Sequence, residues 1–456
     1  MYVTSIASRI AARFWNFAVT SRRKAGAGDL RLGYRVREGA VSTQQISLSV
    51  SQRVRHISIL GKTGTGKTSL IKYLLRQDIS LGNGFCVIDL HGDLTPFVLS
   101  TIAERENRTK SDLSARLVLV DPSSPDYSIG MNLLEGDVDN SGIVAAEMAS
   151  LLKERWKLDS FGARTEELLR NTLEVLIEAK LTLLEVAPFL VSPVFRVNLL
   201  RNVHASEAKE YFESRYGNAS AAMQAAMREP ILNKLSAFTS AQSIRHIVGQ
   251  TSSTVNLTSV MDESRWIVFS FSKSRLGENA ETFASLFLSK IKHALFARKN
   301  RKLFTVYADE VQNLLGSDAL ETMLSEARKF AVGICTANQF ADQVAPRTKA
   351  ALEAVGTRIF FQLASSDAED ATKELDGGRG LFQLLKALPL RNFVYRSDGR
   401  RFATGIVPEI VPAGKLSNDL RLRSIRRWGR GRKEVEQEIQ LRQPQSKHKD
   451  AFDDWE

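Results

Sequence analysis

Cysteine and histidine are scarce in the 456-residue chain, which contains two cysteines and six histidines. Cys86 and Cys335 both lie in apolar runs that predict strands, so we expect reduced side chains inside the core, as is usual in the cytosol. The histidines are scattered, and no Cys or His pairs have the spacing of metal ligands. This pattern argues against a structural zinc site.

Long hydrophobic runs are also missing. No stretch approaches the roughly 18 apolar residues that cross a membrane, so we expect no integral membrane span. Hydrophobic residues make up 43% of the sequence and charged residues 25%, which is typical of a globular protein long enough for more than one structural unit. We expect a cytoplasmic protein, either free or peripheral at the inner membrane.

Acidic residues are absent before Asp29, and the N-terminal segment 1–28 is amphipathic and basic. Its apolar residues recur at helical spacing with two arginines among them: Ile6, Ile10, Phe14 and Phe17, with Arg9 and Arg13. Such a helix either lies on a membrane surface, serves as a transit-like peptide, or docks on the protein body or a neighbouring subunit. We favour the docking helix as the simplest interpretation.

Acidic residues are outnumbered over the whole chain, with 51 Asp and Glu against 63 Lys and Arg, for a formal net charge of +12. This excess favours an acidic partner, nucleic acid first and an anionic membrane surface second, although it also fits a protein kept soluble by its charge. The charged C-terminal tail, residues 412–456, either binds a phosphate backbone, lies across a neighbouring subunit, or is simply solvated. Its basic residues are Arg421, Arg423, Arg426, Arg427, Arg430, Arg432 and Lys433.

Strand and helix signals alternate through most of the chain. Apolar runs that predict strands occupy residues 56–60, 84–90, 115–120, 266–271, 303–308, 331–336 and 358–363. Residues 29–50 predict a preceding strand pair, and residues 392–405 predict a hairpin that turns at Asp398-Gly399. The alternation predicts an α/β fold with a mostly parallel central sheet covered by helices.

Between about residues 140 and 250 the pattern changes to consecutive helices with little strand signal. One apolar stripe consists of Leu168, Leu169, Leu173, Leu176 and Ile177. Thr182 and Glu185 have the spacing of a capping box ahead of the next helix. We therefore expect an inserted all-helical domain at residues 140–252, between two parts of the core at residues 29–139 and 253–411.

A glycine-rich sequence follows the strand at residues 56–60 and precedes a helix. It reads G-K-T-G-T-G-K-T, a complete G-x-x-x-x-G-K-T motif. In such a P-loop, backbone N–H groups and the helix N-terminus surround the phosphates of a nucleotide. Lys67 would reach the β- and γ-phosphates, and the Thr68 hydroxyl would bind Mg²⁺. The expected ATP-binding residues are Gly61, Lys62, Thr63, Gly64, Thr65, Gly66, Lys67 and Thr68.

Two adjacent acids end the strand at residues 303–308. Asp309 would hold Mg²⁺ at the phosphate end of the sheet, and Glu310 would accept a proton from the attacking water. The same acids could instead cap the next helix. The presence of a complete P-loop favours the catalytic interpretation.

Two further polar residues are candidates for the reaction. Gln339 ends the next core strand and either senses the γ-phosphate or orients the water, or is a turn residue. Arg328 ends the preceding helix, where a cation also complements the helix dipole. The alternative is an arginine finger that reaches the ATP of a neighbour.

The strand at residues 84–90 ends in three polar residues, Asp89, His91 and Asp93. They either contact Mg²⁺-bound water and couple the ATP state to a substrate channel, or form a hydrogen-bonded turn. Both interpretations stay open at the level of sequence.

The ordered set of motifs resembles the HerA/FtsK branch of P-loop ATPases, especially conjugative coupling proteins of the TraG/TraD type. The resemblance rests on the strand that runs into the P-loop, the segments 89–94, 307–313, 337–339 and 366–369, and the tail around residues 426–436. It covers most of the chain, from about residue 30 to 440. It implies a RecA-like core that uses ATP and Mg²⁺.

The same resemblance implies a ring, expected to be a hexamer, that pulls DNA through a central channel. It also implies that Arg328 acts in trans and Gln339 acts as a sensor, because their spacing from Asp309 matches these ATPases. The helical segment corresponds to the domain by which coupling proteins recognise DNA or relaxosome partners. The expected partners are therefore DNA, further copies of the chain, and a relaxosome, secretion or nuclease protein.

Two departures separate this sequence from coupling proteins. It has no membrane-spanning helices at its start, and Gln362 follows Phe361 where an arginine is frequent. A membrane-anchored role is therefore in doubt, and a mobile element, DNA processing or anti-phage defence are the alternatives. The main hypothesis is an ATP-driven DNA translocase, and its rival is a regulatory or scaffold ATPase that holds an effector such as a nuclease.

Overall fold

A computed structural model gives the structure of the chain. It describes residues 29–136, 138–158, 162–204, 206–277, 279–314, 318–399, 401–411 and 418–443. The expected N-terminal helix, as well as residues 412–417 and 444–456 of the tail, lies outside the described residues. The chain divides into two compact units, Met1–Leu119 with Leu257–Ser424 and Val120–Asn256 with Ile425–Glu456.

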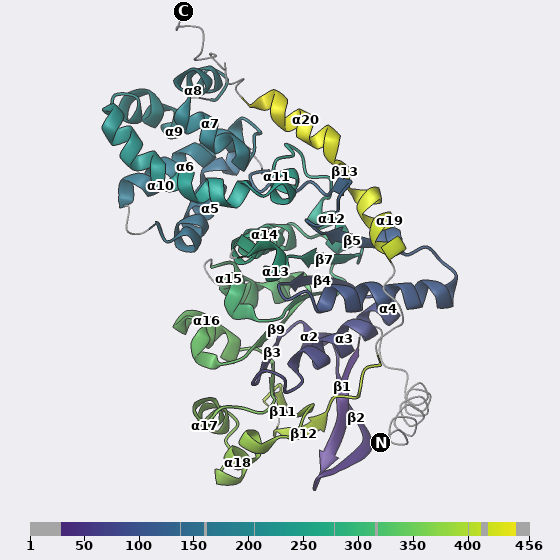
Figure 1. Cartoon of the computed structure of the whole chain (residues 1–456). Coiled ribbons are helices and arrows are strands. Elements are labelled where there is room, and N and C mark those ends of the chain that lie inside the picture. The colour runs from purple at the N-terminus through teal and green to yellow at the C-terminus, as the bar shows by residue number, and fades with distance from the viewer. Residues whose placement is uncertain are drawn as a thin grey trace, which may run out of the picture. The chain divides into compact units, whose positions relative to one another are not determined.

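In the described part of the chain, the first unit is built on an eleven-stranded sheet (Figure 1). The strand order is β2-β1-β12-β11-β10-β3-β9-β8-β4-β7-β5. The strands are β1 (Leu30–Arg37), β2 (Ala40–Leu48), β3 (Ile57–Leu60), β4 (Gly84–Asp89), β5 (Leu117–Val120), β7 (Trp266–Ser270), β8 (Phe304–Ala308), β9 (Val332–Asn338), β10 (Thr357–Phe360), β11 (Asn392–Ser397) and β12 (Ala403–Ile406).

The central strands β10, β3, β9, β8, β4 and β7 are parallel, and Ile59 of β3 lies opposite Ile359 on one side and Ala337 on the other. These strands are almost entirely buried, which explains why they read as continuous apolar runs. The pairs β10-β11, β11-β12, β12-β1 and β1-β2 are antiparallel. The expected mostly parallel α/β sheet is confirmed.

Helices cover both faces of this sheet. Since β-α-β crossovers are right-handed, the strand order puts α3 (Lys67–Leu81) and α4 (Leu94–Thr109) on one face, where they pack together. The opposite direction of travel puts α14 (Asn279–Phe296), α15 (Ala319–Glu326) and α16 (Pro346–Glu353) on the other face (Figure 1). Shorter helices complete the unit: α2 (Val50–Arg53), α12 (Leu257–Asp262), α13 (Lys273–Leu276), α17 (Ser365–Glu374) and α18 (Arg379–Ala387).

The second unit is mainly helical. Its helices are α5 (Ser141–Trp156), α6 (Ala163–Glu178), α7 (Val186–Val191), α8 (Pro193–Leu200), α9 (Glu207–Glu210), α10 (Ala221–Thr239), α11 (Gln242–Val248) and α20 (Arg432–Arg442). The predicted apolar stripe of α6 is buried, and Thr182 and Glu185 form the predicted capping box. Within the described residues, no single helix is long and apolar enough to cross a membrane; one bent pair, Leu183–Val191 with Pro193–Leu200, reaches that length and composition with a 114° bend.

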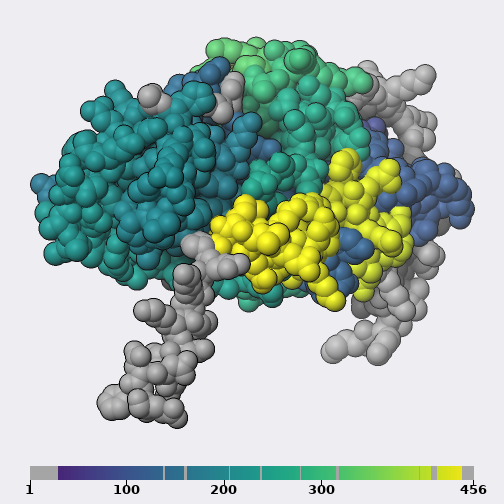
Figure 2. Space-filling view, turned by 90° about the horizontal axis from the view of Figure 1, so that it is seen from above, coloured from purple at the N-terminus to yellow at the C-terminus, as the bar shows by residue number. Residues whose placement is uncertain are grey.

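Part of the charged tail belongs to regular structure. Helix α19 (Asn418–Trp428) is followed by the short strand β13 (Arg430–Gly431), which pairs with β6 (Tyr127–Ser128) in the second unit. Helix α20 continues from there and lies at the surface in yellow in Figure 2. Two tail arginines form ion pairs, Arg423 with Glu106 and Arg430 with Glu438. The charge of these two side chains is thus partly balanced within the chain.

Candidate active site

The loop between β3 and α3 has a backbone that requires glycine at two positions. Gly64 has a φ of 77° and Gly66 a φ of 122°, both in the region that other residues rarely adopt. A Cβ atom on Gly66 would also lie 3.0 Å from the Cα atom of Arg391. These two glycines let the chain curl tightly before α3 begins at Lys67.

Lys67 and Thr68 begin α3 at this loop. The Lys67 ammonium donates to the carbonyl oxygens of Gly61 at 2.6 Å and Lys62 at 3.0 Å. Burial lowers the pKa of Lys67, while the nearby carboxylates of Asp309 and Glu310 act in the opposite direction. The lysine therefore lies inside the loop and within the field of both acids.

Asp309 follows β8 and faces the same helix N-terminus. Its Oδ2 atom accepts a hydrogen bond of 2.9 Å from the Thr68 hydroxyl. Burial raises the pKa of Asp309, and the Thr68 hydrogen bond and the charge of Lys67 oppose that effect. Residues 241 positions apart thus meet at one point, and hydroxyl and carboxylate oxygens are the ligands that Mg²⁺ prefers.

Glu310 is held by polar side chains from three other segments. Gln339 donates to Oε1 at 2.6 Å, while His91 at 2.5 Å and Asn313 at 3.2 Å contact Oε2. The His91 hydrogen bond is the main reason why the pKa of Glu310 falls to about 2. The same contact raises the pKa of His91. Glu310 is therefore an ionised, well-oriented carboxylate next to Asp309.

Gln339 connects the acid to the loop. Its Oε1 atom accepts a hydrogen bond of 2.9 Å from the Thr63 hydroxyl, while its Nε2 atom donates to Glu310. The side chain thus bridges the loop and Glu310 at the carboxyl end of the sheet.

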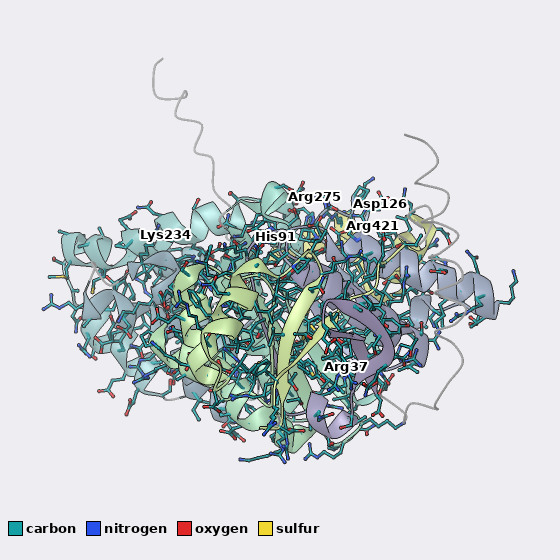
Figure 3. All side chains as sticks on the ribbon, turned by 90° about the horizontal axis from the view of Figure 1, so that it is seen from below. Arg37, His91, Asp126, Lys234, Arg275 and Arg421 are labelled. Carbon is teal, nitrogen blue, oxygen red and sulfur yellow. The ribbon has the colours of Figure 1, made fainter. Side chains whose placement is uncertain are left out.

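The polar residues of the turn after β4 have two different roles. The buried Asp89 carboxylate accepts hydrogen bonds from the Gly92 and Thr95 backbone at 2.8 and 2.7 Å and from the Thr95 hydroxyl at 2.6 Å. These bonds organise the turn and the start of α4. His91, which is labelled in Figure 3, instead contacts Glu310. Asp93 is exposed as the residue before α4.

Arg328 does not lie with the other candidates. It precedes β9, whereas Gln339 follows it, so a strand of seven residues, roughly 20 Å long, separates them. Arg328 is exposed at the amino end of the parallel strands and lines a cavity of about 490 Å³ with Arg55, His56, Arg358 and Arg396. In a single copy of the chain, Arg328 therefore faces away from the loop of Gly61–Thr68.

Three contacts around the loop were not predicted from the sequence. The backbone N–H of Lys62 donates a hydrogen bond of 2.9 Å to the Gln362 carbonyl oxygen, so this N–H group already has a partner within the chain. The Arg391 N–H donates to the Thr65 carbonyl at 2.9 Å. The buried Phe361 lies against Gly61 through its Cα and Cβ atoms and against Gly66 through its ring. The unusual Phe361-Gln362 pair is the one signal that pointed to this region.

The family model of the central domain of helicase HerA matches residues 36–291. No curated protein sequence matches the chain. Among solved structures, the bacterial conjugative coupling protein TrwBdeltaN70 in its unbound form is 14% identical, with a TM-score of 0.60 over 88% of this chain and 94% of that one.

Two further structures give a similar result. TrwB in complex with the ATP analogue ADPNP is 13% identical, with a TM-score of 0.60 over 88% of this chain and 94% of that one. VirB4 of Thermoanaerobacter pseudethanolicus is 16% identical, with a TM-score of 0.57 over 86% of this chain and 99% of that one. At these identities the likeness shows a shared fold.

The family match covers more than half of the chain and includes the loop of Gly61–Thr68, which in this fold lies next to Asp309 at the end of β8. The chain therefore belongs to the family of the HerA helicase central domain, and it is a P-loop ATPase.

Proposed function

We propose that the chain is an ATP-hydrolysing motor that assembles into a ring, expected to be a hexamer, and translocates DNA. The observation that carries the proposal is the meeting of Thr68 and Asp309 beside Lys67, with Glu310 next in sequence. These residues combine phosphate binding, metal binding and a base at one edge of the sheet. TrwB, which shares the fold, has been solved with ADPNP and with ADP and Mg²⁺.

The residues present fit ATP with Mg²⁺. The left-handed glycines Gly64 and Gly66 allow the loop amides to turn toward phosphates, and the N-terminus of α3 favours negative charge. Thr68 and Asp309 would hold Mg²⁺. When bound, this ion neutralises charge on the phosphate oxygens.

Each remaining side chain has a distinct task in the proposed mechanism. Lys67 leaves the Gly61 carbonyl and binds the phosphates. Glu310 orients the attacking water and takes its proton, and Gln339 links that carboxylate to the loop. The low pKa of Glu310 keeps it ionised at neutral pH, as a proton acceptor must be.

Arg328 is proposed to act on the nucleotide of a neighbouring copy. Its position at the amino end of the strands supports a trans role, because it cannot approach the loop of its own chain. An arginine supplied in this way stabilises the charge that develops during phosphoryl transfer and can raise the rate by about 10³–10⁵. Assembly of several copies into a ring is part of the same proposal.

DNA is the proposed substrate of the motor. The net charge of +12 supports a polyanionic partner, and TrwB, which shares the fold, is a bacterial conjugative coupling protein. A relaxosome, secretion or nuclease protein is the proposed further partner. The proposed location is the cytoplasm or the cytoplasmic face of the inner membrane.

ATP turnover measured with and without DNA tests this proposal. We expect DNA to raise turnover several-fold in the wild-type protein, and Lys67→Ala to abolish turnover under both conditions. A roadblock-displacement assay then separates movement from simple stimulation. Turnover that is indifferent to DNA, together with a tightly bound effector, would instead support a regulatory or scaffold ATPase.

A further inference from the structure

His56 is buried at the start of the strand that leads into the P-loop. Only 3% of its surface is exposed, and its φ of 68° lies in the left-handed region that bulky residues seldom adopt. Its carbonyl oxygen accepts a hydrogen bond of 3.2 Å from the Thr357 N–H, which holds it beside β10. Such a strained and enclosed histidine calls for a structural reason.

The imidazole of His56 binds main-chain groups on both sides of Arg328. Its Nδ1 atom accepts a hydrogen bond of 3.1 Å from the Ile334 N–H. The ring proton therefore resides on Nε2, and a hydrogen bond with the main chain of Leu324 acts to raise the pKa of the ring. Leu324 precedes Arg328 by four residues and Ile334 follows it by six, so one side chain holds both ends of this segment.

The surroundings of His56 favour the neutral ring that this bonding pattern needs. Burial lowers the pKa of His56 to about 4, and the positive charge of Arg328 acts in the same direction. At neutral pH the ring thus keeps one donor and one acceptor. A second proton would remove the acceptor that receives the Ile334 N–H.

The segment that carries Arg328 is short and irregular. It forms a 3-10 helix, Ala327–Phe330, and ends at Ala331 with a φ of 53°. The Arg328 side chain is exposed and lines the same cavity as His56. The position of the guanidinium therefore depends on how firmly the main chain around it is held.

We propose that His56 is a positioning residue that fixes the main chain on both sides of Arg328 and so presents the guanidinium to the nucleotide of a neighbouring copy. The inference rests on the proposed trans role of Arg328. It assigns to the strand before the P-loop a second task, which serves the site of another subunit. Nucleotide binding in the same chain does not depend on it.

Mixing experiments with full-length variants can separate these two sites. His56→Ala removes both hydrogen bonds, whereas His56→Asn retains an acceptor for the Ile334 N–H. For His56→Ala we expect kcat to fall more than tenfold, with KM for ATP and the affinity for a fluorescent ATP analogue unchanged. We expect an intermediate kcat for His56→Asn.

Complementation identifies the subunit on which His56 acts. Lys67→Ala chains offer an intact Arg328 without a working P-loop, so adding them to His56→Ala chains should restore turnover several-fold. Arg328→Ala chains offer a working P-loop without the arginine, so adding them to His56→Ala chains should restore little. The control mixture of Lys67→Ala with Arg328→Ala should regain turnover if Arg328 acts in trans.

The possible results have distinct meanings. An inactive control mixture would refute the trans role of Arg328, and the inference about His56 with it. If the control mixture is active but His56→Ala is rescued only by Arg328→Ala, His56 serves its own P-loop and the inference is wrong. If His56→Ala does not unfold cooperatively on heating, the same mixtures with His56→Asn decide the question.

Discussion

Glu310 accepts hydrogen bonds from His91, Gln339 and Asn313 while its own backbone has a φ of 56°. Each donor favours the ionised carboxylate, and together they fix its direction. A left-handed backbone at a non-glycine residue costs energy and persists only where the surroundings enforce it. The strained backbone of Glu310 therefore lowers the stability of the fold, while the three hydrogen bonds fix the direction of its carboxylate.

Replacing this carboxylate by an amide should separate binding from hydrolysis. We expect Glu310→Gln to reduce ATP turnover by about 10²–10⁴-fold, the usual contribution of a general base, while a fluorescent ATP analogue binds with unchanged affinity. Single-turnover hydrolysis and equilibrium binding measure the two properties. Glu353→Gln, at an exposed glutamate of α16, is the control, and normal turnover in Glu310→Gln would exclude Glu310 as the base.

At the scale of residues, the sequence predicts motifs made of neighbouring residues, but it does not predict contacts between residues that are far apart in the chain. The P-loop and the Asp309-Glu310 pair are read directly, since each follows a buried strand. The contact of His91 with Glu310 joins segments that are 219 positions apart in numbering, and the contacts of His56 depend on strand β9 and helix α15. No local pattern encodes such contacts, because strand order decides them.

At the scale of elements, helix α3 is anchored to β8 by a buried polar cluster. Arg53 donates to both carboxylate oxygens of Asp78, at 2.9 and 2.8 Å, and to the Thr305 hydroxyl at 2.8 Å. The Tyr307 hydroxyl donates to Asp78 at 2.6 Å, and Asn83 donates at 2.8 Å. The cluster ties the helix that begins at the P-loop to the strand that ends at Asp309.

Breaking this cluster on one side should destabilise the first unit strongly. Asp78→Ala removes the carboxylate that balances the buried Arg53 charge, and we expect the free energy of unfolding to fall by about 3–5 kcal/mol. Replacing the group together, as Arg53→Met, Asp78→Leu and Tyr307→Phe, should recover most of the loss because no buried charge remains. Urea unfolding followed by circular dichroism measures both, and a loss below about 1 kcal/mol in Asp78→Ala would contradict this account.

Element types were predictable where periodicity is strong. The parallel strands are buried on both faces and read as apolar runs, and the hairpin turns at Asp398-Gly399 with φ values of 53° and 67°. Strand order was not predictable, because it depends on which crossover lies on which face. The pairing of β6 with β13 was also missed, since two-residue strands have no periodicity.

At the scale of the whole molecule, the proposed reaction requires more than one copy of the chain. The P-loop lies at the carboxyl ends of the parallel strands and Arg328 at their amino ends. An interface that joins two different edges is heterologous, and such interfaces close into rings when the rotation permits.

We therefore expect native mass spectrometry to show a species several times the 50.8 kDa of the chain, sixfold for the expected hexamer, in the presence of ATP analogue and DNA. Arg328→Ala should form the same species, because the arginine is expected to act in the reaction rather than in assembly. A protein that stays monomeric under conditions of full turnover would refute the shared site.

The ladder between β6 and β13 has a consequence for how the chain can be divided. Residues 430 and 431 complete a strand pair begun some 300 positions earlier, and beyond them Glu436 contacts the buried His246 while Arg442 reaches the buried Glu185. The helical unit therefore consists of two segments, an internal one and one from the C-terminal end of the chain. Cutting out the internal stretch alone would remove Glu436 from His246 and Arg442 from Glu185, so exchanging this unit between proteins must carry both pieces.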